Sequence, residues 1–280
     1  MEELRVCAFF DVLGTREIMM GDDIERRHAL INLIRRLQEK TSDYSAGVQN
    51  LGLGVSFSPS AQTTTFSDNV AVSFPLERMS LEGTVGNKPH TFYVETSQFF
   101  DHLLIQAISA VWDGLKIGVL FRGGISVGKL VHDGKIIAGE ALVKAVELEK
   151  DTKYPRIEIS QEVMELVDEN GNSVVSNDLK ESLECIDDRW FVKTLDLHIG
   201  YWRDHNWYRQ QKGEEPEEIP SILARIRSAL DAENERAMKT EAAPVIEKWN
   251  WFMNKFEASF KEGYWPRVSG AYEAACKVRC

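Results

Sequence analysis

Residues 63–75 have the sequence TTTFSDNVAVSFP, and this stretch decides the fold. Its two halves are rich in β-prone residues and flank Ser67-Asp68-Asn69, a triplet typical of tight turns. The pattern predicts a β-hairpin with Asp68 at its tip. Before it, the apolar run at residues 4–10 predicts a strand that ends at Asp11, with Gly14 just beyond.

The remaining elements extend this unit into a domain. Apolar periodicity predicts helices over residues 23–38, 95–113, 140–150 and from Ser160 to 167, with Asp23 and Ser160 as N-caps. A second hairpin is predicted from 115–127 and 135–138, around His132-Asp133-Gly134, followed by a short strand at 157–159. Residues 41–62 and 75–90 are predicted to be loops. This order predicts an α+β fold with a ferredoxin-like βαββαβ core, in which helices cover one face of an antiparallel sheet.

The C-terminal part differs in composition. Residues 212–220, KGEEPEEIP, form an acidic linker, so we divide the chain into a domain over 1–211 and a helical extension over 212–280. Two helices are predicted there, at 221–243 and 245–262, broken at Pro244. The second has an aromatic stripe at helical spacing, including Trp249, Phe252 and Phe256, which favours packing on the protein's own core or on a partner subunit.

Composition excludes several classes of protein. A formal net charge of −11 in 280 residues disfavours nucleic-acid binding. The N-terminus lacks the basic segment and long apolar run of a signal peptide, and no stretch approaches the roughly 20 apolar residues that span a bilayer. We therefore expect a cytoplasmic protein. The four cysteines contain no CxxC pair, which predicts reduced thiols rather than a zinc site.

Two aspartates stand out by position. The first strand of a βαββαβ sheet lies beside the first hairpin, so Asp11 and Asp68 can reach the same edge. Mg²⁺ and Mn²⁺ prefer such carboxylate oxygens, usually together with substrate phosphates. The segment from Val12 to Thr15 contains Gly14 and could offer backbone N–H groups to phosphate oxygens. Taken alone, an aspartate in a turn is more often a turn former than a ligand.

Four segments, in this order along the chain, favour the interpretation of the two aspartates as ligands. They are AFFDVLGT (8–15), FSDNVAVSFP (66–75), FRGGISVGKLVHDGKIIAGEALVKAVELE (121–149) and YPRIEISQEVMELV (154–167). Together they resemble the catalytic domain of class III nucleotidyl cyclases, over roughly residues 4–170. That family has a strand ending in F-x-D, a G-D hairpin, an R-x-G hairpin that leads into a helix, and an I-x-V-S strand. The size and the two-helix tail further resemble the bacterial pyrimidine cyclases of Pycsar antiphage systems, which make cyclic UMP or cyclic CMP.

The resemblance implies roles for particular residues. Asp11, Val12 and Asp68 fall at the positions that bind two Mg²⁺ or Mn²⁺ ions. Val12, Leu13, Gly14 and Thr15 fall on the turn that holds the phosphates, and Thr64 and Ile136 fall where the base is recognised. The family works as an antiparallel homodimer with composite active sites, which implies the same assembly for this chain. The implied substrate is a nucleoside triphosphate, and a separate effector protein would detect the cyclic product.

Departures from the family pattern concern the helix at 140–150. The family has an asparagine and an arginine that stabilise the transition state where this chain has Val143 and Glu147. Arg122, Lys144, Lys129 and Lys135 are the candidates to supply the missing cation. Each has an ordinary alternative: Arg122 as a structural ion-pair partner, and the lysines as solvated side chains.

Other residues of these segments have structural interpretations. We expect His132 to be a turn residue, Glu140 and Glu149 to be helix-surface charges, and Gly123, Gly124 and Gly128 to permit close packing.

Three hypotheses follow. The first is a pyrimidine nucleotide cyclase that converts UTP or CTP to the 3′,5′-cyclic monophosphate and pyrophosphate. The second is an adenylate or guanylate cyclase with an unusual pocket, since Thr64 and Ile136 are not the residues that recognise adenine or guanine in the family. The third, favoured by Val143 and Glu147, is a catalytically degenerate module that binds a nucleotide and signals through a partner.

Overall fold

A computed structural model gives the fold over most of the chain. It describes residues 2–42, 62–76, 79–85, 88–94, 96–133, 136–167, 171–195, 210, 213, 215, 219–239 and 241–261. The predicted loop at 41–62 therefore lies almost wholly outside the described residues.

The elements follow one another as the sequence patterns predict, with additions. The strands are β1 (Glu3–Leu13), β2 (Gln62–Phe66), β3 (Asn69–Pro75), β4 (Met79–Val85), β5 (Lys88–Val94), β6 (Leu120–His132), β7 (Ile137–Gly139), β8 (Ile157–Ile159), β9 (Leu183–Ile186) and β10 (Arg189–Val192). The helices are α1 (Thr15–Met20), α2 (Ile24–Ser42), α4 (Thr96–Leu115), α5 (Glu140–Asp151), α6 (Gln161–Met164), α7 (Asn177–Lys180), α9 (Ile219–Lys239) and α10 (Ala243–Lys261).

The main sheet confirms the predicted fold class. Its strand order is β2-β3-β1-β6-β8-β10-β9, and β1 is antiparallel to both of its neighbours, β3 and β6. With β2 antiparallel to β3, the first four strands have the order and directions of a ferredoxin-like βαββαβ core. Among the described strands, the exception to antiparallel pairing is β8, which runs parallel to β6. The protein is thus an α+β protein built on a mainly antiparallel sheet.

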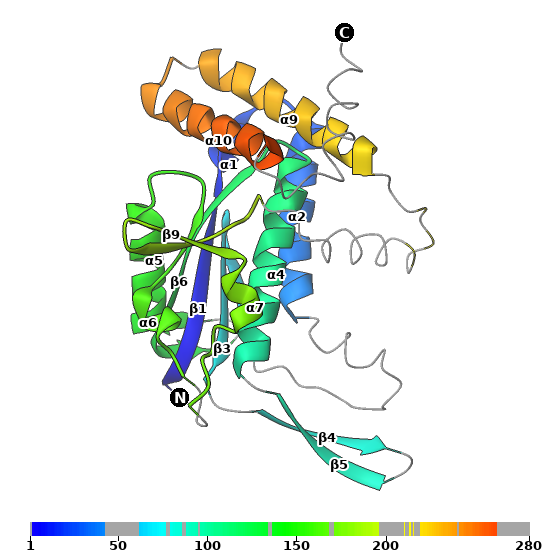
Figure 1. Cartoon of the computed structure of the whole chain (residues 1–280). Coiled ribbons are helices and arrows are strands. Elements are labelled where there is room, and N and C mark those ends of the chain that lie inside the picture. Colours follow the sequence, from blue (N-terminus) through cyan, green and yellow to red (C-terminus); the bar gives the residue numbers. More distant parts are fainter. Residues whose placement is uncertain are drawn as a thin grey trace.

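Helices cover both faces of this sheet rather than one (Figure 1). Val6, Ala8 and Phe10 of β1 belong to the main core, together with residues of α2 and α4 such as Leu30 and Phe100. On the opposite face, Cys7 and Phe9 pack in small clusters with residues of α5. A strand alternates its side chains between faces, so the continuous apolar run of β1 follows from burial on both sides.

Two glycines explain why α5 can lie on that second face. A Cβ on Gly124 would stand 2.1 Å from the Ala145 carbonyl oxygen, and one on Gly128 would stand 3.0 Å from the Ala141 nitrogen. The glycines therefore permit the close approach of a helix to β6. The prediction that all the helices cover one face was therefore wrong, because helical periodicity does not say which face of the sheet a helix covers.

Several local predictions were incomplete or wrong; for example, the helix predicted from Ser160 to 167 ends at Met164. Residues 75–90 were predicted as loop, but β4 and β5 form a two-stranded antiparallel ribbon that stands apart from the main sheet (Figure 1). The loop was predicted from the proline, glycine and asparagine residues of this segment, although the segments that form β4 and β5 also contain β-prone residues. β1 continues past Asp11 to Leu13, and the short helix α1 was not predicted.

The C-terminal helices contribute to the same core as the sheet. α9 and α10 lie across the end of the sheet towards which β1 runs (Figure 1). Ile222, Ile226 and Leu230 of α9 and Phe252 and Phe256 of α10 are buried in the main core cluster. Pro244 is the second residue of α10, where its missing N–H costs nothing. No helix in the described part of the chain is long and apolar enough to cross a membrane.

Candidate active site

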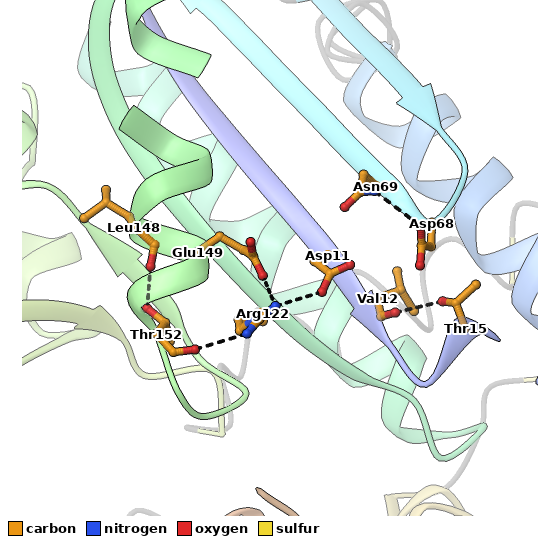
Figure 2. A network of polar contacts seen from close by, with 9 residues as sticks. All are labelled: Asp11, Val12, Thr15, Asp68, Asn69, Arg122, Leu148, Glu149 and Thr152. Carbon is orange, nitrogen blue, oxygen red and sulfur yellow. Dashed lines mark hydrogen bonds and ion pairs between the residues drawn. The ribbon is translucent and has the colours of Figure 1, made fainter. Parts of the chain in front are cut away.

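Asp11 lies within β1, between the two strands that flank it. Its Cα pairs with Asn69 of β3 on one side and with Arg122 of β6 on the other. Because side chains directly opposite on neighbouring strands share a face, this register brings Arg122 to Asp11. Arg122 Nη2 lies 3.3 Å from Asp11 Oδ2, as Figure 2 shows.

Asp68 lies in the turn between β2 and β3, as predicted. Ser67, before it, has φ of 60°, a left-handed conformation that this tight turn requires. The Val12 backbone N–H donates to the Asp68 carbonyl oxygen over 3.3 Å, so the turn is joined to the end of β1. The Asp68 side chain accepts from Asn69 Nδ2 at 3.3 Å. These contacts bring Asp11 and Asp68 to the same edge of the sheet (Figure 2).

Arg122 is shared between two carboxylates. Besides Asp11 it forms an ion pair with Glu149 at the end of α5, and its Nη1 donates to the Thr152 carbonyl oxygen over 3.5 Å. Its Nε is buried and has no hydrogen-bond partner among the described residues. The structure thus places Arg122 in ion pairs with protein carboxylates, with one buried donor unsatisfied. Glu149 is 4% exposed, so its prediction as a helix-surface charge was wrong.

The two carboxylates of this network have raised pKa values. Burial raises the pKa of Asp11 above its ordinary range, Arg122 opposes that rise, and the negative charge of Asp68 adds to it. Burial likewise raises the pKa of Glu149, again opposed by Arg122 and increased by Asp11. Asp11 and Asp68 are therefore close enough to repel one another, and a cation between them would relieve that repulsion.

The segment after Asp11 is a tight turn into α1. Gly14 has φ of 82°, and no heavy atom lies within 4 Å of where its Cβ would stand. Only a glycine adopts this conformation without strain. The Thr15 hydroxyl donates to the Val12 carbonyl oxygen at 2.8 Å, which fixes the turn from inside (Figure 2). Val12 and Thr15 are buried, whereas Gly14 between them is exposed, so the backbone at Gly14 is what a ligand could contact.

Thr64 belongs to a hydrogen-bonded chain that the sequence analysis missed. Its hydroxyl is 2.9 Å from Nε2 of His132, whose Nδ1 is 2.8 Å from the Ser73 hydroxyl. Ser73 in turn accepts from Arg5 Nε at 2.8 Å. Burial and the charge of Arg5 lower the pKa of His132 to about 4, so the ring is neutral at neutral pH.

His132 was predicted to be a turn residue, and that prediction was wrong. It is the last residue of β6 and is 5% exposed. Arg5, a charged residue inside an apolar strand, was the signal in the sequence that buried polar partners lie nearby.

The remaining candidates lie elsewhere. Lys144 pairs with Glu140 and Glu162 on the outside of α5, and Lys129 is exposed on β6. Val143, Glu147 and Ile136 are also exposed. None of these side chains joins the network at Asp11 within the described part of the chain. Lys135 lies outside the described residues.

The donor set at Asp11 and Asp68 fits a hard divalent cation. The two carboxylates are oxygen donors, which Mg²⁺ and Mn²⁺ prefer. The Val12 carbonyl, the third predicted ligand, accepts from the Thr15 hydroxyl, and Val12 is buried. Among the described residues, no group of three or more His, Cys, Asp or Glu side chains could hold a metal ion. A cation held here would therefore take its other ligands from water or from phosphate oxygens, as Mg²⁺ commonly does.

Comparison with known proteins shows distant likeness to solved structures alone. No protein-family model matches the chain, and no curated protein matches it. Among solved structures, the crystal structure of the catalytic core of a rhodopsin-guanylyl cyclase with converted specificity, in complex with ATPαS, is similar at 14% sequence identity and a TM-score of 0.38. The match covers 69% of this chain and 97% of that chain. The assignment of fold class rests on the strand order and pairing given above.

Proposed function

We propose that this protein is a nucleotidyl cyclase that acts on a pyrimidine nucleoside triphosphate. The 3′-hydroxyl oxygen of UTP or CTP would attack the α-phosphorus, the bond to the β-phosphate would break, and pyrophosphate would leave. The hydroxyl proton passes to solvent. The resemblance of the sequence to Pycsar pyrimidine cyclases suggests a role for the product. The cyclic nucleotide would act in the cytoplasm as an antiphage signal detected by a separate effector protein.

The observation that supports the proposal most is the convergence of Asp11 and Asp68. They are 57 positions apart in the chain, yet the β1–β3 register and the Val12–Asp68 hydrogen bond bring them to one edge. Each negative charge is unfavourable for the other, and Asp11 is also partly buried. Carboxylates that are perturbed by burial and by one another are common at sites that bind a ligand or a cation.

Each further residue has a definite task in this proposal. A divalent cation held by Asp11 and Asp68 would acidify the ribose 3′-hydroxyl and offset charge on the α-phosphate. Arg122 holds Asp11 in place and retains an unsatisfied Nε donor. The turn from Val12 to Thr15 would offer backbone N–H groups beyond that of Val12, which donates to Asp68, to the phosphates. Thr64 would face the base. The small uncharged Thr64 side chain suits a pyrimidine ring better than the groups that recognise purines in the family.

We propose that the active form is a homodimer with composite sites. Val143, Lys144 and Glu147 lie on the outward side of α5, where a second subunit could reach them. In that arrangement Lys144 of one subunit would approach the phosphates bound by the other. Sedimentation should show a dimer at assay concentration, and specific activity should fall when the protein is diluted below the dissociation constant of the dimer. Full activity from a monomer would contradict the composite site.

One observation favours a second function. Glu147 is acidic and exposed at the place where the family has a transition-state arginine, and Arg122 is held by Asp11 and Glu149. A module that binds a nucleotide without turning it over would show this arrangement.

The decisive test of the enzyme is an incubation of the purified protein with UTP, CTP, ATP and GTP separately, each with Mn²⁺. Mass spectrometry should detect the cyclic monophosphate and pyrophosphate from UTP or CTP. Product from ATP or GTP alone would reject the pyrimidine specificity. Binding without product from any of the four nucleotides would favour the degenerate module.

A further inference from the structure

A cavity of about 480 Å³ lies between the turn at Gly14 and the C-terminal helices. Leu13 and Gly14 line one side of it, and Lys248 and Trp249 of α10 line the other. The cavity therefore begins at the turn to which the proposed function assigns the phosphates. It is closed on its far side by a part of the chain that lies more than 200 residues away in sequence.

The wall of the cavity formed by α2 and α9 contains two arginines that share one glutamate. Arg26 Nη2 lies 2.6 Å from Glu233 Oε2, and Arg236 pairs with the same carboxylate. Asp23 also lines the cavity and its charge acts on Arg26, so the two guanidinium groups face two carboxylates. Arg26 Nε is buried and has no hydrogen-bond partner among the described residues, so this wall has an unsatisfied donor.

Lys248 differs from Lys255 of α10 and from the nearby Lys153 in its ion pairing. Lys153 pairs with Glu247, and Lys255 lies 4.0 Å from Glu184, whereas Lys248 has no ion-pair partner among the described residues. The positions three and four residues away on its helix hold Val245, Pro244, Trp251 and Phe252, so no carboxylate is available on the helix itself.

The charge of Lys248 acts instead on the candidate active site. Lys248 lines the same cavity as Leu13 and Gly14, the residues that follow Asp11 by two and three positions, and its charge is felt at Asp11. Lys248 therefore lies within electrostatic reach of Asp11 while lining the cavity beside Gly14. A half-buried ammonium group in that position suits a ligand with several negative charges.

We propose that this cavity receives the terminal phosphates of the bound nucleoside triphosphate and that Lys248 of α10 contacts them. The inference rests on the proposed function and gives the C-terminal helices a direct part in it. The positive charge that Glu147 cannot supply from α5 would come from the same subunit. Glu17, Asp22 and Asp23 also line the cavity but are exposed, and these acidic side chains would favour a metal-complexed polyphosphate over a free one.

Inorganic tripolyphosphate with Mn²⁺ is the probe that tests this contact without depending on the base or on turnover. Calorimetry should show that Lys248→Gln weakens its binding roughly tenfold or more, as expected for one charge-assisted contact. Lys248→Arg should stay within about threefold of the unmodified protein, because the charge is kept. Lys255→Gln, which removes the same charge further along α10, should bind as the unmodified protein does. Thermal melting should show that all three variants are folded.

The possible results separate the two proposals. Equal binding by Lys248→Gln and the unmodified protein, or no binding by the unmodified protein, would overturn the role of Lys248. If that happened while UTP or CTP was still cyclised, the proposed function would stand. If tripolyphosphate binding depended on Lys248 but no nucleotide was cyclised, the polyphosphate site would stand and the proposed activity would fall.

Discussion

Asp68 is the residue whose removal separates function from fold most cleanly. It is only partly buried, and its side chain accepts one local hydrogen bond, from Asn69. Asp68→Ala should therefore change the free energy of unfolding by less than about 1 kcal/mol, as is usual for a surface position. It should abolish cyclisation, measured as cyclic product over time. Normal turnover by a folded Asp68→Ala variant would mean that the site has been misplaced.

His132 gives a stability prediction with a definite sign. Its pKa is about 4 in the folded protein, against an ordinary value of 6.5. As the pH falls through 6.5, the unfolded chain binds a proton at His132 that the folded protein does not bind. The free energy of unfolding therefore has its full contribution from His132 above that pH. It should decline as the pH falls towards 4, by up to about 3 kcal/mol, since one unit of pKa difference is about 1.4 kcal/mol.

Urea denaturation at several pH values measures this effect. His132→Gln removes the titrating ring, so the decline between pH 6.5 and 4 should be shallower in that variant than in the unmodified protein. Identical slopes would show that the ring of His132 does not remain neutral in the folded state.

At the scale of elements, the contact between β6 and α5 holds Arg122 and Glu149 together. Gly124 permits this contact, because an added Cβ would lie 2.1 Å from a backbone oxygen of α5. Gly124→Ala should lower the free energy of unfolding by about 1–3 kcal/mol through overpacking. It should also reduce activity, because a shift of α5 moves Glu149 away from Arg122.

Gly14→Ala is the matched control for Gly124→Ala. Space around Gly14 is open, so an added Cβ there meets no other atom. Gly14→Ala should lower the free energy of unfolding by roughly 1–2 kcal/mol, the cost of placing a residue with a Cβ at φ of 82°. Urea titrations of both variants check the two values. A Gly124→Ala variant as stable as the unmodified protein would show that α5 does not pack closely on β6.

The elements also show how far the sequence could be interpreted. Local patterns predicted the hairpin at Asp68, the strand before Asp11 and the capped helix after Ser160, because each depends on residues close in the chain. The Arg122 ion pairs and the His132 chain depend on strand register and on the packing of α5. No local spacing encodes either of these features.

At the scale of the whole molecule, the C-terminal helices stabilise the same core as the sheet. Phe252 of α10 is 2% exposed and belongs to the main cluster. Phe252→Ala should cost about 3–5 kcal/mol, whereas Met238→Ala on the exposed side of α9 should cost far less. Thermal unfolding of the unmodified protein should then be a single transition. A separate early transition in Phe252→Ala would show that residues 212–280 fold independently.

The position of that extension was accessible from the sequence only in part. The aromatic stripe of residues 249–256 predicted packing, but both the protein's own core and a partner subunit remained possible surfaces. The structure places Phe252 and Phe256 against the protein's own core, and this contact brings Lys248 to the cavity beside Gly14. The sequence separation between Gly14 and Lys248 left no pattern from which their proximity could be predicted.

The proposed activity requires Asp11 and Asp68 to bind a divalent cation together, and Mn²⁺ calorimetry on a double-mutant cycle tests this directly. The titration would use the unmodified protein, Asp11→Asn, Asp68→Asn and the double variant, in the presence of tripolyphosphate to complete the coordination. Each single variant should lose most of the Mn²⁺ affinity, and the double variant should lose little more, because the two side chains act on one ion. Single variants that bind Mn²⁺ as tightly as the unmodified protein would contradict the account.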